Sequence, residues 1–150
     1  MKKLSILILL LPLVFSACKE DQSEVDRELI LQYIADNNID ATEGAEGLYY
    51  VIDTVGPGEA PNLSSDVIVD YEGFLLDGSK FDSSIDRGAP STFGLNSVIR
   101  GWQLGIPLFN EGGSGLLIIP SELAYGRSSP SNAIPRNAVL VFTIQLHEVL

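Results

Sequence analysis

From residue 47 to the C-terminus, the chain consists of short runs in which apolar and polar residues alternate, and this two-residue period restricts the possible folds more than any other feature. One run has Val67, Val69 and Tyr71 at alternate positions, and the run over 139–150 places four apolar residues on one face. Because successive side chains of a strand point to opposite faces, each run predicts a strand with one buried face. Turn sequences between the runs predict an antiparallel sheet.

Residues 98–108 break the two-residue period. Val98, Trp102 and Ile106 are four residues apart, which is the spacing of one face of a helix. The run 116–119 is continuously apolar, and it predicts a strand that is buried on both sides or that faces this helix. Together these patterns predict an α+β domain in which an antiparallel sheet wraps around one short helix.

A second helix is expected before the sheet domain, over residues 23–38. Apolar residues recur there at spacings of three and four, and Ser23 with Asp26 is a candidate capping pair. A helix of this length is marginal on its own in water. Its apolar face should therefore pack on the following domain in a monomer, or on a second copy of the chain in a dimer. Residues 40–47 are expected to form a polar linker.

The charge of the chain excludes one class of partner. The sequence has 20 Asp and Glu against 9 Lys and Arg, and residues 19–46 hold nine of the acids and two of the bases. Because nucleic-acid binding needs a basic face, nucleic acid is excluded as a partner. The chain has one Cys and one His, which excludes a zinc site built from those ligands. We expect neither a metal nor a cofactor.

The first 17 residues have the layout of a secretory signal, with two lysines, an apolar run and two small residues before Cys18. The apolar run is shorter than the roughly 20 residues that span a bilayer. Residues 15–18 resemble a bacterial lipobox, which implies that Cys18 is acylated after cleavage. The alternative is an ordinary signal peptide that leaves a free thiol. We expect an outer-membrane lipoprotein of the bacterial cell envelope, on the periplasmic or the surface face, with an acidic tether and helix over 18–46.

A series of short motifs runs through residues 47–150 in a fixed order. They are Val-Asp-Tyr-Glu-Gly at 69–73, Asp-Gly at 77–78 with Phe-Asp-Ser-Ser at 81–84, Val-Ile-Arg-Gly-Trp at 98–102, Ile-Pro-Ser-Glu-Leu-Ala-Tyr-Gly at 119–126, and Ile-Pro at 134–135 with Leu-Val-Phe at 140–142. This series resembles the FKBP-type peptidyl-prolyl cis-trans isomerase domain. The resemblance implies a half-barrel sheet curled around the short helix, with a ligand pocket between them and no cofactor.

The same resemblance implies the residues of that pocket. Trp102 would form its floor, Asp82 and Tyr125 its polar rim, and the Tyr125 hydroxyl and the Ile99 backbone N–H would donate to substrate carbonyls. The residues expected to act on the prolyl bond are Tyr71, Phe81, Asp82, Ile99, Trp102, Tyr125 and Phe142. The residues expected to bind the substrate are Phe93, Val98 and Ile134.

Three positions depart from the best-known small members of this family. Ser91 replaces a large aromatic residue and Ala133 a branched aliphatic residue, which implies a wider and shallower pocket wall. Arg136 replaces a proline, which implies a different shape for that loop. The expected activity is isomerisation of proline-containing polypeptides during the folding of envelope or exported proteins. Macrolides such as rapamycin are expected inhibitors. The alternative is an FKBP-like binding module or chaperone that holds its clients with little turnover.

Overall fold

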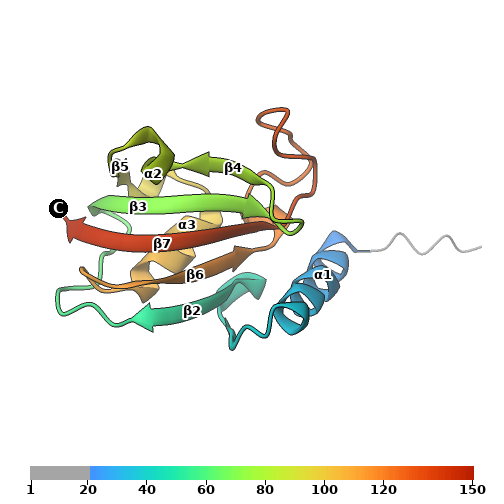
Figure 1. Ribbon diagram of the computed structural model, residues 1–150, viewed down its shortest axis with the longest axis horizontal. Helices are drawn as coiled ribbons and strands as arrows, with labels where there is room; N and C mark the ends of the chain where they lie inside the picture. The colour runs from blue at the N-terminus through green and yellow to red at the C-terminus, as the bar shows by residue number, and fades with distance from the viewer. Residues whose placement is uncertain (1–20) are drawn as a thin grey trace, which may run out of the picture.

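The computed structural model describes residues 21–150, and in this part of the chain seven strands form one antiparallel sheet (Figure 1). Their order is β1-β2-β6-β7-β3-β4, and β5 also pairs with β3. The strands are β1 (Thr42–Glu43), β2 (Tyr49–Thr54), β3 (Asp66–Leu75), β4 (Lys80–Ser83), β5 (Ser91–Gly94), β6 (Ser114–Ile119) and β7 (Leu140–Val149). The expected signal peptide and Cys18 lie outside the described residues.

Short helices connect the strands, and one longer helix precedes them. The α-helices are α1 (Gln22–Asp36), α2 (Ser84–Arg87) and α3 (Arg100–Gly105), and the 3-10 helices are η1 (Ala45–Gly47), η2 (Leu95–Ser97), η3 (Ile106–Leu108) and η4 (Ser121–Leu123). The predicted α+β class, with a sheet packed on a short helix, is confirmed. No helix within residues 21–150 is long and apolar enough to cross a bilayer.

The main core lies between one face of the sheet and α3, which is behind the sheet in Figure 1. Glycines let this helix approach β6 closely. A Cβ added at Gly101 would lie 2.4 Å from the Ile119 side chain, and one at Gly105 would lie 2.6 Å from Leu117. The close approach brings Trp102 into the core, where it is 4% exposed. The position of this side chain therefore depends on the small residues beside it.

The edge of β3 is shared between two short strands, and this division opens the sheet at Tyr71. Residues 66–69 of β3 pair with β5, and residues 72–74 pair with β4. At the gap between them, the Tyr71 backbone N–H donates to the Ser84 hydroxyl of α2 at 2.9 Å. Because a buried backbone N–H needs a partner, this side chain takes the place of a neighbouring strand.

A second apolar cluster lies under α1, at the end of the sheet where β7 begins (Figure 1). Ile30 is fully buried there. Its buried neighbours come from β2, from β6, from the start of β7 and from the residue before β7, and they are Tyr49, Ile118, Val141 and Val139. The helix therefore docks on the sheet domain, which was one of the two expected arrangements. A dimer through this helix stays a prediction. Strand β6 is buried on both sides, since Leu117 belongs to the main core on one face and Ile118 to the cluster under α1 on the other.

Two local expectations at the N-terminal arm are wrong. The helix is capped by Asp21, whose carboxylate accepts from the Ser23 N–H at 3.4 Å, so Ser23 and Asp26 are not a capping pair. Asp26 is buried instead. The expected linker over 40–47 contains strand β1 and helix η1, and β1 pairs with β2. The sheet therefore starts before residue 47.

The docking of α1 can be tested with two neighbouring residues. Ile30→Ala should lower the free energy of unfolding of residues 19–150 by about 2–5 kcal/mol, because it leaves a cavity between helix and sheet. Leu29→Ala is the matched control, since Leu29 is 46% exposed and should change that free energy by less than about 1 kcal/mol. Chemical denaturation measures both. Equal losses in the two variants would contradict the docked arrangement.

Candidate functional site

A cavity of about 370 Å³ opens between the sheet and the segment that leads into α3. We call it the aromatic pocket. Its lining residues are Tyr71, Phe81, Asp82, Phe93, Ser97, Val98, Ile99, Trp102, Tyr125 and Phe142. The structure thus brings together nine of the ten residues that the sequence predicted for the site. Ile134 is not among them, because its side chain is buried in the main core.

Trp102 lies at the centre of the aromatic side chains. Its ring is 5.1 Å from that of Tyr71 and 5.4 Å from those of Phe93 and Phe142, measured between centroids. The three interplanar angles lie between 80° and 89°, so each contact is edge to face. This geometry places the positive edge of one ring against the negative face of the next and is favourable beyond apolar burial. The pocket floor is therefore a rigid apolar surface.

A polar network closes one side of the pocket. The Tyr71 hydroxyl donates to an Asp82 carboxylate oxygen at 2.5 Å, and Arg87 on α2 donates to the other carboxylate oxygen. A second Arg87 nitrogen donates to the Tyr71 hydroxyl at 2.9 Å and to the Ser91 hydroxyl at 3.1 Å. The guanidinium also lies 5.4 Å above the Tyr71 ring. The network fixes the ring that packs against Trp102.

The charges of this network shift two pKa values. Partial burial of Asp82 by itself raises its pKa, but hydrogen bonds from Tyr71 and Arg87 outweigh this effect and hold the pKa below its usual value. Burial of Tyr71, together with its hydrogen bond to Asp82, raises the pKa of the phenol. At neutral pH, Asp82 is therefore an anion and Tyr71 a neutral hydrogen-bond donor.

The rim of the pocket has groups that can bind a polypeptide. Tyr125 follows η4 and is 38% exposed, so its hydroxyl can reach a ligand at the mouth. Ile99 is the N-cap residue of α3, and its carbonyl accepts from the Trp102 N–H at 2.9 Å. Ser97 adds a hydroxyl to the lining. Within residues 21–150, no group of three or more acidic, His or Cys side chains is placed to hold a metal.

The sequence missed two residues of the site. Arg87 lies on α2, which has four residues and is too short to show a helical period. Ser97 ends the three-residue helix η2 and has no pattern either. Ser91 accepts a hydrogen bond from Arg87 and does not line the pocket. Ala133 and Arg136 are exposed. The effect of Ser91 and Ala133 on the width of the pocket, and that of Arg136 on the shape of its loop, stay predictions.

Comparison with known proteins identifies the family. The sequence model of the FKBP-type peptidyl-prolyl cis-trans isomerases matches residues 58–147. The chain belongs to this FKBP-type family. FkpA of Aeromonas hydrophila is 44% identical to it over 119 residues, which cover 77% of the chain and 43% of that relative. Mip of Coxiella burnetii is 41% identical over 105 residues, which cover 70% and 46%. The chain therefore spans less than half the length of these two curated relatives.

Solved FKBP-type structures have the same arrangement. The crystal structure of FkpA from Escherichia coli aligns with a TM-score of 0.72 and 35% identity, covering 85% of this chain and 62% of that one. A peptidyl-prolyl cis-trans isomerase from Pseudomonas syringae aligns with a TM-score of 0.72 and 32% identity, covering 85% and 95%. The antiparallel sheet on a short helix is therefore the FKBP-type fold.

The network around Asp82 should make stability depend on pH. Since its folded pKa is depressed, Asp82 stabilises the fold at neutral pH, and this contribution is lost as the pH falls below about 4. In Arg87→Ala, the depression is smaller, so the free energy of unfolding should fall less between about pH 5 and pH 2 than in the wild type. Denaturant titrations at each pH measure the difference. Arg127→Ala, at an exposed position, should keep the wild-type pH dependence. Identical curves for wild type and Arg87→Ala would contradict this account.

Proposed function

We propose that the chain catalyses cis-trans isomerisation of Xaa-Pro bonds in polypeptides and so assists the folding of exported or envelope proteins. The observation that carries the proposal is the aromatic pocket, with Trp102 at its floor and the polar groups of Asp82 and Tyr125 at its side and rim. Family membership and the FKBP-type fold support it.

The chemistry of this reaction fits a pocket without a nucleophile. Rotation about an Xaa-Pro amide breaks resonance, with a barrier of about 18–20 kcal/mol. The planar amide is charge-separated and is favoured by water, whereas the twisted amide is less polar. An apolar pocket that excludes water therefore destabilises the planar form relative to the transition state. A ten-thousandfold acceleration needs only about 5.5 kcal/mol of such differential binding.

Each group of the pocket has a role in this proposal. The proline ring packs on Trp102 and against the surrounding aromatic walls. Tyr125 donates a hydrogen bond to a substrate carbonyl and so orients the bond for rotation, and the Ile99 backbone N–H does the same for another carbonyl. The Asp82 carboxylate holds Tyr71 and Arg87 in place and faces the rotating amide. The substrate contact that the sequence predicts for Ile134 is not carried into this proposal, because its side chain is buried in the main core.

Asp82→Ala should lower kcat/KM on a short Xaa-Pro peptide by about tenfold or more. The variant removes the charged acceptor of three hydrogen bonds, from Tyr71, Arg87 and the Ser83 backbone N–H, each worth about 1.5–3 kcal/mol, and releases the Tyr71 ring. A protease-coupled isomerisation assay measures the rate, and circular dichroism checks that the fold is kept. Asp53→Ala is the matched control, because Asp53 is exposed on β2 and does not line the pocket. An unchanged rate in Asp82→Ala would contradict the site assignment.

The same assay separates the isomerase from a binding module. The module alternative requires peptide binding with undetectable turnover.

We further propose that rapamycin occupies the aromatic pocket and inhibits turnover. Trp102 is the single tryptophan of the chain, so its fluorescence reports occupation of the pocket directly. Rapamycin binding without any inhibition of turnover would place the reaction elsewhere.

We also propose that the protein is anchored by a lipid on Cys18 at the bacterial outer membrane. The support is the run of small residues before this single cysteine, after an apolar stretch. Cys18→Ala should abolish incorporation of labelled palmitate in an expressing bacterium, whereas Lys19→Ala should keep it. Protease accessibility on intact cells then distinguishes the surface face from the periplasmic face. Label retained in Cys18→Ala would contradict the anchor.

A further inference from the structure

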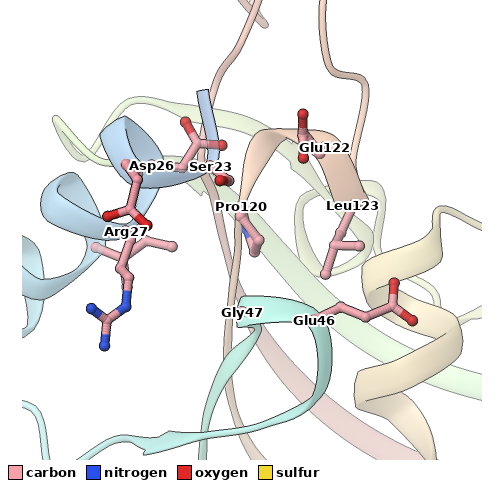
Figure 2. A pocket seen from close by; sticks show the side chains of 10 residues that line it. Ser23, Asp26, Arg27, Glu46, Gly47, Pro120, Glu122 and Leu123 are labelled. Atoms are coloured by element: carbon pink, nitrogen blue, oxygen red, sulfur yellow. The ribbon is translucent and has the colours of Figure 1, made fainter. Parts of the chain in front are cut away.

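A second cavity, of about 330 Å³, lies where α1 meets the sheet domain, and Figure 2 shows the side chains around it. Three parts of the chain that are far apart in sequence form its walls. They are the first turns of α1, the end of η1, and the segment from Pro120 to Leu123. In Figure 2, Asp26 projects from α1 on the side of the cavity opposite Leu123. The cavity marks a junction between the N-terminal arm and the loop that carries Tyr125.

Asp26 is the polar contact across this junction. Of the charged residues between 21 and 150, Asp26 alone is fully buried, with 0% exposure. One carboxylate oxygen accepts from the backbone N–H of Ser121 at 2.7 Å, and the other accepts from the Gln22 side chain at 2.7 Å. A buried charge is costly unless it is hydrogen-bonded, so this carboxylate is held in one place. The contact joins residues that are 95 positions apart.

Ser121 needs a partner of this kind because it begins η4. The first N–H groups of a helix have no acceptor within the helix, and a buried one therefore needs an acceptor from elsewhere in the chain. Here the preceding residue is Pro120, which has no side-chain acceptor and makes no cap. Asp26 supplies the acceptor from another helix.

The loop with Tyr125 is built on the same residue. The Ser121 carbonyl accepts from the N–H groups of Ala124 at 3.0 Å and Gly126 at 2.8 Å, so Tyr125 lies inside a turn that closes on Ser121. On the other side of this segment, Leu123 is part of the main core together with Trp102. A shift of Ser121 would therefore move the backbone that presents the Tyr125 hydroxyl to the aromatic pocket.

We propose that Asp26 is a positioning residue for the isomerase reaction, which acts through Ser121 to hold Tyr125 at the pocket rim. The N-terminal helix is then part of the catalytic unit rather than a spacer before it. The inference rests on the proposed function, because it assigns Tyr125 a contact with the substrate. The ion pair of Arg27, the next residue of α1, does not involve this loop: Arg27 pairs with Glu43 of β1 at 3.7 Å, on the surface.

A double-mutant cycle with Asp26→Ala and Tyr125→Phe tests the proposal. Loss of the Tyr125 hydroxyl should lower kcat/KM about fivefold, which is the value of one hydrogen bond. Asp26→Ala should lower it by up to the same factor, and the double variant should be no worse than Tyr125→Phe alone, since both remove the same contact. The proposal would be overturned if kcat/KM of the double variant fell by the product of the two single-variant factors, or if kcat/KM of Asp26→Ala equalled that of the wild type.

Two further variants separate positioning from stability. Asp26→Asn keeps an acceptor oxygen and should recover most of the rate that Asp26→Ala loses, and it remains informative if the alanine variant does not fold. Glu24→Gln is the matched control, because Glu24 lines the same cavity but is exposed; its kcat/KM should equal that of the wild type. A rate for Asp26→Asn as low as that for Asp26→Ala would show that the acceptor geometry is not what matters.

Amide hydrogen exchange tests the contact without any assay of activity. Residues 121–126 should exchange several-fold faster in Asp26→Ala than in Glu24→Gln, and unchanged exchange would overturn the inference. A wild-type chain without turnover would contradict the isomerase proposal alone. In that case rapamycin affinity, read from Trp102 fluorescence, replaces kcat/KM in the same cycle, with the same two outcomes.

Discussion

The hydrogen bond from the Tyr71 backbone N–H to the Ser84 hydroxyl holds together the parts of the site. It lies where the edge of β3 passes from β5 to β4, and it lets α2 occupy the place of a strand. Because α2 lies there, Arg87 reaches both the Tyr71 hydroxyl and Asp82. The ring of Tyr71 in turn packs edge to face on Trp102. An interruption of the sheet is therefore the origin of the aromatic pocket.

Much of the fold and most of the pocket could be predicted from the sequence, because both follow from local periods and from motifs. Tyr71 and Phe142 have the parity of buried strand residues, and Trp102 has the helical spacing that points it at the sheet. Ile134 shows the limit of a motif. It stands in the expected sequence context, but its carbonyl accepts from the Ser129 hydroxyl at 2.7 Å and its side chain turns into the core.

The contacts that could not be predicted join residues far apart in the chain. Asp26 has the pattern of an ordinary polar residue near the start of a helix, and its burial depends on the approach of Pro120 and Ser121. The pairing of Arg100 with Glu46 is similar, since it links the start of α3 to η1 at 2.5 Å. In neither pair does a sequence period or a spacing between motifs predict that the two residues meet. The sequence predicts a boundary between the arm and the domain after residue 46. In the structure, β1 of the arm pairs with β2 of the domain in one sheet.

The strand order has a consequence for the way this protein is made. β7 lies at the middle of the sheet, between β6 and β3, but of the seven described strands it is the last to be synthesised. Until it emerges, the two halves of the sheet have open edges and the apolar cluster under α1 lacks Val139 and Val141. Such non-local pairing folds slowly and leaves unpaired strands exposed meanwhile. The nascent chain therefore keeps unpaired strands of the kind that folding helpers protect from aggregation, and its sheet closes only when residues 140–149 of β7 have been made.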